Sequence, residues 1–214
     1  MSVIKLVNSS LTTYNNTKWE IGKWNKVDKF NNDLNNGAGG FHSYDTLPIA
    51  ALHNYLLCGK KYRINNPRPF SALIGGDAVG NKYMFKTSSL CIETELIFPS
   101  INNINMVAYG ILCAKSVFNN VEFIKWAHNW LNGNDRSIAA ADLMVKQIKE
   151  DDNRNIYLPA RAALEAVINY TDALDSSDGF QTSCVQNASA AFYNAAQNGQ
   201  LDLKELSKQA LDIK

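Results

Sequence analysis

The sequence is poor in cysteine, and its cysteines lie far apart. Four occur in 214 residues, at positions Cys58, Cys91, Cys113 and Cys184. None forms a Cys-x-x-Cys pair, which argues against a zinc knuckle and against a dithiol redox motif. The histidines do not supply the missing ligands, because His42 and His53 are not at the i,i+4 spacing common in metal pairs. We therefore expect reduced, mostly buried thiols, no metal and no cofactor.

The chain also lacks an excess of charge of one sign and a long apolar run. It has 21 Lys and Arg against 20 Asp and Glu, for a net charge of +1. Such a balance provides no overall basic field for nucleic acid or anionic membranes. No run approaches the ~18 apolar residues of a membrane span, and the opening MSVIKLVNSS is too short for a signal-peptide core. We expect a soluble, intracellular protein that does not bind nucleic acid directly.

What the sequence does contain changes in character near residue 100. The first part alternates apolar and polar residues in short segments bounded by Gly, Pro and Asn, which is typical of β-strands. The strands expected in this part are residues 2–7, 18–27, 68–76, 82–87 and 88–98. One helix interrupts them at 46–59, where Thr46 can cap, Pro48 lies in the first turn and Gly59 can end the helix.

The second part has helical periodicity. Alanine-rich segments with one bulky residue per turn predict closely packed helices. The helices expected are 106–118, 120–133, 137–152, 159–174, 182–199 and 203–213. Asn132 and Gly133 should end the second helix, Asp135 or Ser137 should cap the third, Pro159 should open the fourth and Asp202 the last. Phe123, Trp126 and Trp130 recur at helical spacing, which indicates core packing.

These patterns predict an α+β protein. It should consist of a small N-terminal β-rich domain with one helix, residues 1–100, followed by an α-helical array, residues 101–214. With 46% hydrophobic residues the chain can bury a real core.

The run GAGGFHSYD, residues 37–45, raises the question of a reaction centre. We interpret it as a loop leading into the 46–59 helix, in which His42 bonds to the backbone. Adjacent His42 and Ser43 side chains point apart, so they cannot act as base and nucleophile. GAGG and IGGDAVG match neither phosphate-loop pattern, and Asp77 fits a turn. Glu93 and Glu95 share one strand face, which favours a solvated face over acid–base chemistry.

Three segments of the chain form a recognisable set of motifs: Gly40-Phe41-His42, Val107–Ala114 and Trp126–Arg136. Together they resemble an uncharacterised family of tailed-phage and prophage proteins, and the resemblance covers residues 19–145. An Asn-rich insert before GAGG and a tail poorer in Trp and Arg depart from the family pattern. The resemblance implies a phage origin and no particular reaction.

The absence of a clear catalytic pattern favours a binding role. Our first hypothesis is a non-enzymatic inhibitor of a host defence complex, anti-CRISPR-like or otherwise, acting in the host cytoplasm through a few aromatic and basic anchors. The candidate binding residues are Trp19, Trp24, His42, Tyr62, Arg63, Arg68 and Phe70. Trp19 and Trp24 could instead cover the open end of the β domain. A structural or packaged virion protein is the alternative function.

An enzyme is the second alternative. The Gly-Phe-His-Ser turn is similar to the nicotinamide-binding turns of ADP-ribosyltransferase-like domains. The similarity implies that His42 would bond the ribose of NAD and that Tyr44 or Tyr83 would stack on the nicotinamide. Glu93 or Glu95 would stabilise the oxocarbenium-like transition state. No Ser-Thr-Ser-like strand accompanies this turn, which weighs against the enzyme.

Overall fold

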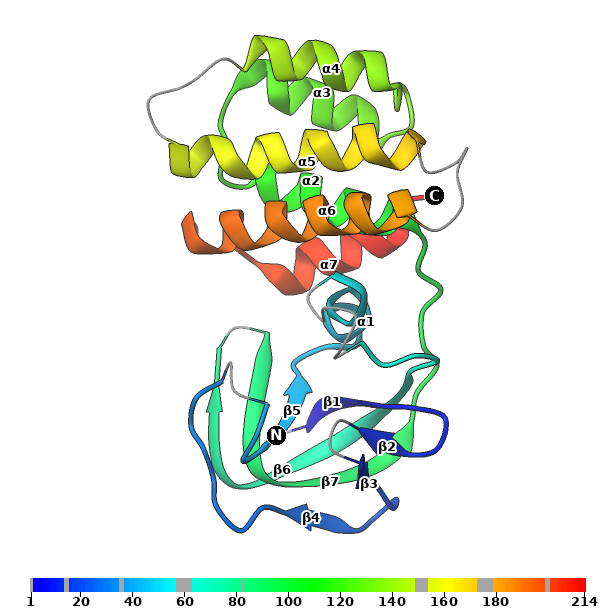
Figure 1. The fold of residues 1–214 in the computed structure, drawn as a ribbon, viewed down its shortest axis with the longest axis vertical. Helices are drawn as coiled ribbons and strands as arrows, with labels where there is room; N and C mark the ends of the chain where they lie inside the picture. Colours follow the sequence, from blue (N-terminus) through cyan, green and yellow to red (C-terminus); the bar gives the residue numbers. More distant parts are fainter. Residues whose placement is uncertain are drawn as a thin grey trace. The chain divides into compact units, whose positions relative to one another are not determined.

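The computed structural model describes residues 2–13, 16–34, 37–56, 63–81, 83–148, 154–172, 179–198 and 201–214. The chain is α+β, with strands and one helix first and further helices after them. It divides into two compact units, Met1–Ser100 and Ile101–Lys214 (Figure 1).

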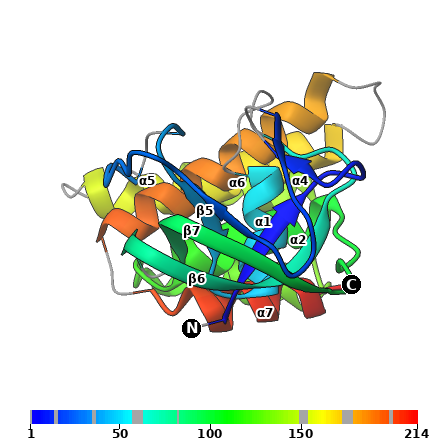
Figure 2. The ribbon, with the colours of Figure 1, turned by 90° about the horizontal axis from the view of Figure 1, so that it is seen from below.

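The first unit is built on a curved antiparallel sheet. Its elements are β1 (Ser2–Val7), β2 (Thr12–Thr13), β3 (Thr17–Lys18), β4 (Trp24–Lys26), β5 (Phe41–Tyr44), α1 (Leu47–Leu56), β6 (Arg68–Gly80) and β7 (Met84–Glu95). The long strands β6 and β7 form a hairpin and run side by side (Figure 2). Strand β1 pairs with β6 and with β5, and β5 pairs with β7. The four strands therefore close into a small barrel, whereas β4 pairs only with β7 and lies at an edge.

Alternation along these strands fills the barrel with one set of side chains. The core residues are Val3, Val7, Trp19, Phe41, Phe70, Ala72, Leu90 and Ile92. The rings of Trp19 and Phe41 meet edge to face at 5.1 Å. Aromatic pairs in this arrangement add stability beyond the area that they bury. The sheet is thus organised around a core to which β5 contributes.

Four sequence predictions are wrong in this unit. Residues Phe41–Tyr44 form β5 and are not part of a loop, because their buried–exposed alternation inserts them between β1 and β7. The expected strand 18–27 is interrupted, because Gly22 adopts φ +76° and turns the chain between β3 and β4. Asp77 lies in β6 beside a register irregularity and not in the hairpin turn. The expected strands 82–87 and 88–98 form one strand, β7.

The second unit is a helical array around a buried central helix. Its helices are α2 (Asn103–Lys115), α3 (Val121–Leu131), α4 (Ile138–Gln147), α5 (Arg154–Asp172), α6 (Gly179–Asn198) and α7 (Leu203–Asp212). Every residue from Asn105 to Ala114 is buried, and α3, α5, α6 and α7 all contact α2. A side chain at Gly110 would come within 3.2 Å of the Ala188 backbone. Small residues therefore allow α2 and α6 to approach closely.

Several helix caps in the second unit confirm the sequence predictions, although α2 begins and ends three residues earlier than expected and α4 ends at Gln147 and not at residue 152. Asn132 is the C-cap of α3 and Gly133 follows with φ +76°, while Ser137 and Asp202 cap α4 and α7. Phe123, Trp126 and Trp130 are buried, as predicted. Pro159 does not open α5, because the helix already begins at Arg154 and Pro159 lies inside it. Gly59 lies outside the described residues. In the described part of the chain, no helix is both long and apolar enough to cross a membrane.

Candidate functional site

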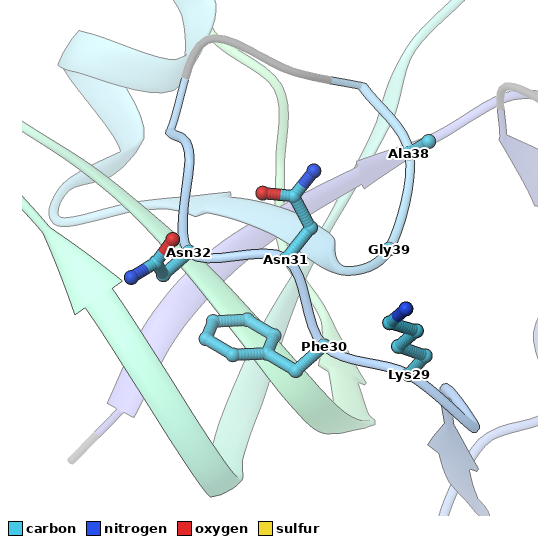
Figure 3. Close-up of a pocket in the computed structure, with 6 residues that line it drawn as sticks. All are labelled: Lys29, Phe30, Asn31, Asn32, Ala38 and Gly39. Carbon is cyan, nitrogen blue, oxygen red and sulfur yellow. The ribbon is translucent and has the colours of Figure 1, made fainter.

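The segment before β5 forms a closed loop over the barrel. Its base is the hydrogen bond from the Asn31 amide to the Gly39 carbonyl, at 2.8 Å. Gly39 has φ +71°, and a side chain there would lie 2.8 Å from the Asn31 Cβ. Beside this base lies a pocket of about 550 Å³, shown in Figure 3. Its lining residues are Lys29, Phe30, Asn31, Asn32, Ala38 and Gly39.

A buried lysine of β7 holds the loop. The Lys86 ammonium donates to the Asp33 carbonyl at 2.9 Å and to the Ala38 carbonyl at 2.8 Å, so it joins the two arms. A side chain at Gly40 would lie 2.7 Å from the Lys86 Cε. Burial lowers the pKa of Lys86, and the Asp33 charge opposes that shift. The glycines of GAGG thus make room for the Asn31 contact and for the lysine stem.

His42 is a second attachment point for the loop. Its Nε2 lies 2.9 Å from the Leu34 carbonyl, which can only accept, so Nε2 carries the hydrogen. Its own carbonyl accepts from the buried Lys5 ammonium at 2.7 Å. Burial is the largest cause that lowers the pKa of His42, and the charges of Lys5 and Lys86 lower it further, against the Leu34 bond. His42 therefore bonds to the backbone as a neutral ring.

The residues of the NAD hypothesis are not brought together. Tyr44 and Tyr83 both contact His53 of α1, with ring centroids 5.9 and 4.9 Å apart. Burial lowers the pKa of His53 to about 3. Glu93 is seven residues along β7 from Lys86, the strand partner of His42, or about 23 Å in an extended strand.

Glu95 is occupied by an ion pair. Arg68 bonds it through two nitrogens, with Nε 2.7 Å from Oε1. This pairing lowers the pKa of the Glu95 carboxyl. The geometry places neither Glu93 nor Glu95 at the His42 turn, and this weighs against the ADP-ribosyltransferase hypothesis.

The candidate binding residues have different surroundings. Trp19 and Phe70 are buried barrel residues, so they are not available as surface anchors. Arg68 is half-buried beside Glu95, and Arg63 stacks on the Tyr55 ring at 4.2 Å. Tyr62 lies outside the described residues.

Trp24 is the aromatic candidate that is open to solvent. Its exposed fraction is 46%, and its ring rests against Gly75, where an added Cβ would come within 2.7 Å of Cζ3. Ile21, three positions earlier, has an exposed fraction of 57%. We call these two exposed residues, which lie three positions apart at or just before edge strand β4, the apolar edge patch. Sequence alternation placed Ile21 inside an expected strand and did not mark it as exposed.

Nothing in the sequence marks Lys5 and Lys86 as buried, because lysine in an alternating strand indicates a solvent-facing position.

Among the described residues, no group of three or more His, Cys, Asp and Glu side chains could hold a metal ion. Cys91 and Cys113 are free and buried.

No protein-family model matches the chain, and no curated protein or solved structure is significantly similar to it.

Proposed function

We propose that this chain is a phage-encoded binding protein that inhibits a host defence complex and catalyses no reaction of its own. The observation that carries the proposal is the apolar edge patch. A tryptophan and an isoleucine that remain exposed on a folded domain are the kind of side chain that dominates binding energy when a partner buries it.

The patch is also prepared for binding. The Trp24 ring lies against Gly75, so its rotamer is already restricted before a partner arrives. Restricting an anchor in advance reduces the entropy lost on association. Exposed Lys18 and Lys26 lie near the patch along the chain and neither takes part in an ion pair among the described residues, whereas Glu20 and Lys23 pair with each other. These charges favour a partner surface that is apolar at its centre and acidic around it.

The test is phage plating on a host that carries an active defence system. Expression of the full chain should restore plaque formation, and Trp24→Ala should abolish the restoration while the protein remains folded. Ile97→Ser is the matched control, because Ile97 has an exposed fraction of 91% in the same unit but lies outside the patch. Ile97→Ser should leave the restoration intact.

A pull-down with the tagged chain identifies the partner. Recovery of a defence complex by the unmodified chain, and its loss with Trp24→Ala, is the expected result. Recovery of capsid or tail proteins alone would contradict the inhibitor proposal and favour the virion alternative. No restoration of plaques on any defended host, with no capture from infected or uninfected lysate, would contradict binding of either kind.

A further inference from the structure

The loop between Asn31 and Gly39 has energetically unfavourable features that packing of the barrel core does not require. None of its described residues belongs to the barrel core. Its shape nevertheless uses a buried ammonium, Lys86, and a glycine in the left-handed region, Gly39. Burying a charge is costly and adds less stability than apolar packing of similar size. Compact loops with joined ends and enforced backbone conformations are frequently functional.

Three hydrogen-bonded attachments give the pocket a defined shape. The Asn31–Gly39 bond closes the base, Lys86 joins the Asp33 and Ala38 carbonyls, and His42 holds the Leu34 carbonyl. The pocket volume, about 550 Å³, is within the usual range of small-molecule sites, about 300–1,000 Å³. The backbone of the described loop residues is therefore held in place before any ligand binds.

The lining combines three kinds of group. In Figure 3 the Phe30 ring and the Asn32 amide lie on one side, and the Lys29 ammonium points toward Gly39. An aromatic face stacks on a planar heterocycle. A carboxamide offers a donor and an acceptor side by side, as the edge of a nucleobase requires. A lysine binds phosphate as a point charge.

The electrostatic surroundings favour an anion. Lys29 is exposed at the pocket, and it is the one cationic side chain among the residues that line it. No carboxylate is among these lining residues, and the Asp33 charge acts on the buried Lys86. The positive charge of the lining is therefore at Lys29.

We propose that this pocket binds a mononucleotide. The base stacks on Phe30 and meets the Asn32 amide, and the phosphate lies at Lys29. Lys86 is a positioning residue that shapes the pocket without contacting the ligand. The site needs no glycine-rich phosphate loop, since Lys29 supplies the contact that GAGG does not. It uses residues other than the apolar edge patch, so it is independent of the proposed inhibitor function.

The test is calorimetric titration of the full chain with adenosine 5′-monophosphate, adenosine and inorganic phosphate, repeated with the guanine, cytosine and uracil monophosphates. We expect one mononucleotide to bind more tightly than its nucleoside. Lys29→Gln should lower the affinity for that mononucleotide about tenfold and leave the affinity for the nucleoside unchanged. Phe30→Ala should lower the affinity for both ligands about tenfold. Lys23→Gln, an exposed lysine outside the pocket, is the matched control and should change neither.

The positioning role has its own readout. Lys86→Met should lower the affinity for the mononucleotide and for the nucleoside equally. It alters the shape of the loop and removes no contact to the phosphate. If Lys86→Met does not fold, Asn32→Ala tests the proposed base contact instead and should lower the affinity for both ligands severalfold. Absence of binding by all four monophosphates at millimolar concentration would overturn the proposal. Phosphate binding as tightly as the mononucleotide, or affinity unchanged in both Lys29→Gln and Phe30→Ala, would overturn it as well.

Discussion

At the scale of single residues, the glycines before β5 leave room for side chains that lie far from them in the sequence. Gly39 needs a left-handed backbone and also allows Asn31 to approach, whereas Gly40 leaves room for the stem of Lys86. The cluster resembles a flexible or phosphate-binding segment when read alone. In the structure it permits a loop to close over a buried lysine.

Gly39 can be compared directly with Gly22. Both have positive φ, but nothing lies within 4 Å of a Cβ added at Gly22, whereas Asn31 Cβ lies 2.8 Å from one added at Gly39. Gly22→Ala should lower the free energy of unfolding by about 1 kcal/mol, the cost of the left-handed backbone. Gly39→Ala should lower it by about 2–3 kcal/mol, because steric overlap is added. Urea denaturation measures both, and equal losses would contradict the steric account.

At the scale of elements, the second unit depends on polar contacts at helix ends as well as on apolar faces. Asn105 of α2 forms a capping box with Asn102 and donates to the Ala210 and Ile213 carbonyls at the end of α7, each at 3.0 Å. Asn105 is buried, its bond to Ala210 is buried as well, and its bond to Ile213 is partly buried. One amide therefore joins the start of α2 to the end of the chain.

Asn105→Ala should lower the free energy of unfolding of the second unit by about 2–3 kcal/mol, because it removes a cap bond and leaves two carbonyls without that donor. Ser137→Ala removes only the exposed cap of α4 and should cost about 1 kcal/mol. Chemical denaturation of both variants, followed by circular dichroism, measures the difference. A loss for Asn105→Ala no larger than for Ser137→Ala would show that the α7 contacts add nothing.

At the scale of the whole molecule, the two units should respond differently to acid. His53 has a pKa lowered by burial to about 3, against 6.5 in an unfolded chain. Between these values the unfolded state binds more protons, so stability falls as pH drops below 6.5. From pH 7 to pH 5 the unit Met1–Ser100 should lose about 2 kcal/mol. Lys5, with a pKa of about 7, changes stability mainly above pH 7 and affects this window little.

Scanning calorimetry at pH 7 and pH 5 should therefore show one transition that moves down by about 10 °C and one that does not. His53→Gln should reduce this pH dependence and leave the part that comes from His42, whose pKa is also lowered by burial. His128→Gln, at an exposed position of α3, should leave the dependence as it is. A single transition that shifts as a whole would contradict independent unfolding of the two units.

Much of the fold was predictable because its signals are local. Helix caps at Ser137 and Asp202, the C-terminal Gly133 and the buried tryptophans of α3 all follow from neighbouring residues. The failures have different causes. Strand β5 has only four residues, so its alternation was too short to be recognised. The start of α5 was misplaced because Pro159 was taken as its first turn, whereas the helix begins at Arg154.

The candidate site was only partly predictable. His42 was correctly expected to bond to the backbone, and Trp24 was correctly counted among surface residues. Trp19, with the same spacing signals as Trp24, is a core residue, because the chain turns at Gly22 between them. No pattern along the chain could have distinguished the two tryptophans.

The sequence by itself determined the α+β class and the succession of elements, because periodicity, caps and turns act over a few residues. The tertiary structure alone decided that β5 closes the barrel, that Lys5 and Lys86 are buried and that the loop before β5 forms a pocket. Those features depend on hydrogen bonds between residues 37 to 53 positions apart. Contacts of that range require the folded chain to bring the partners together.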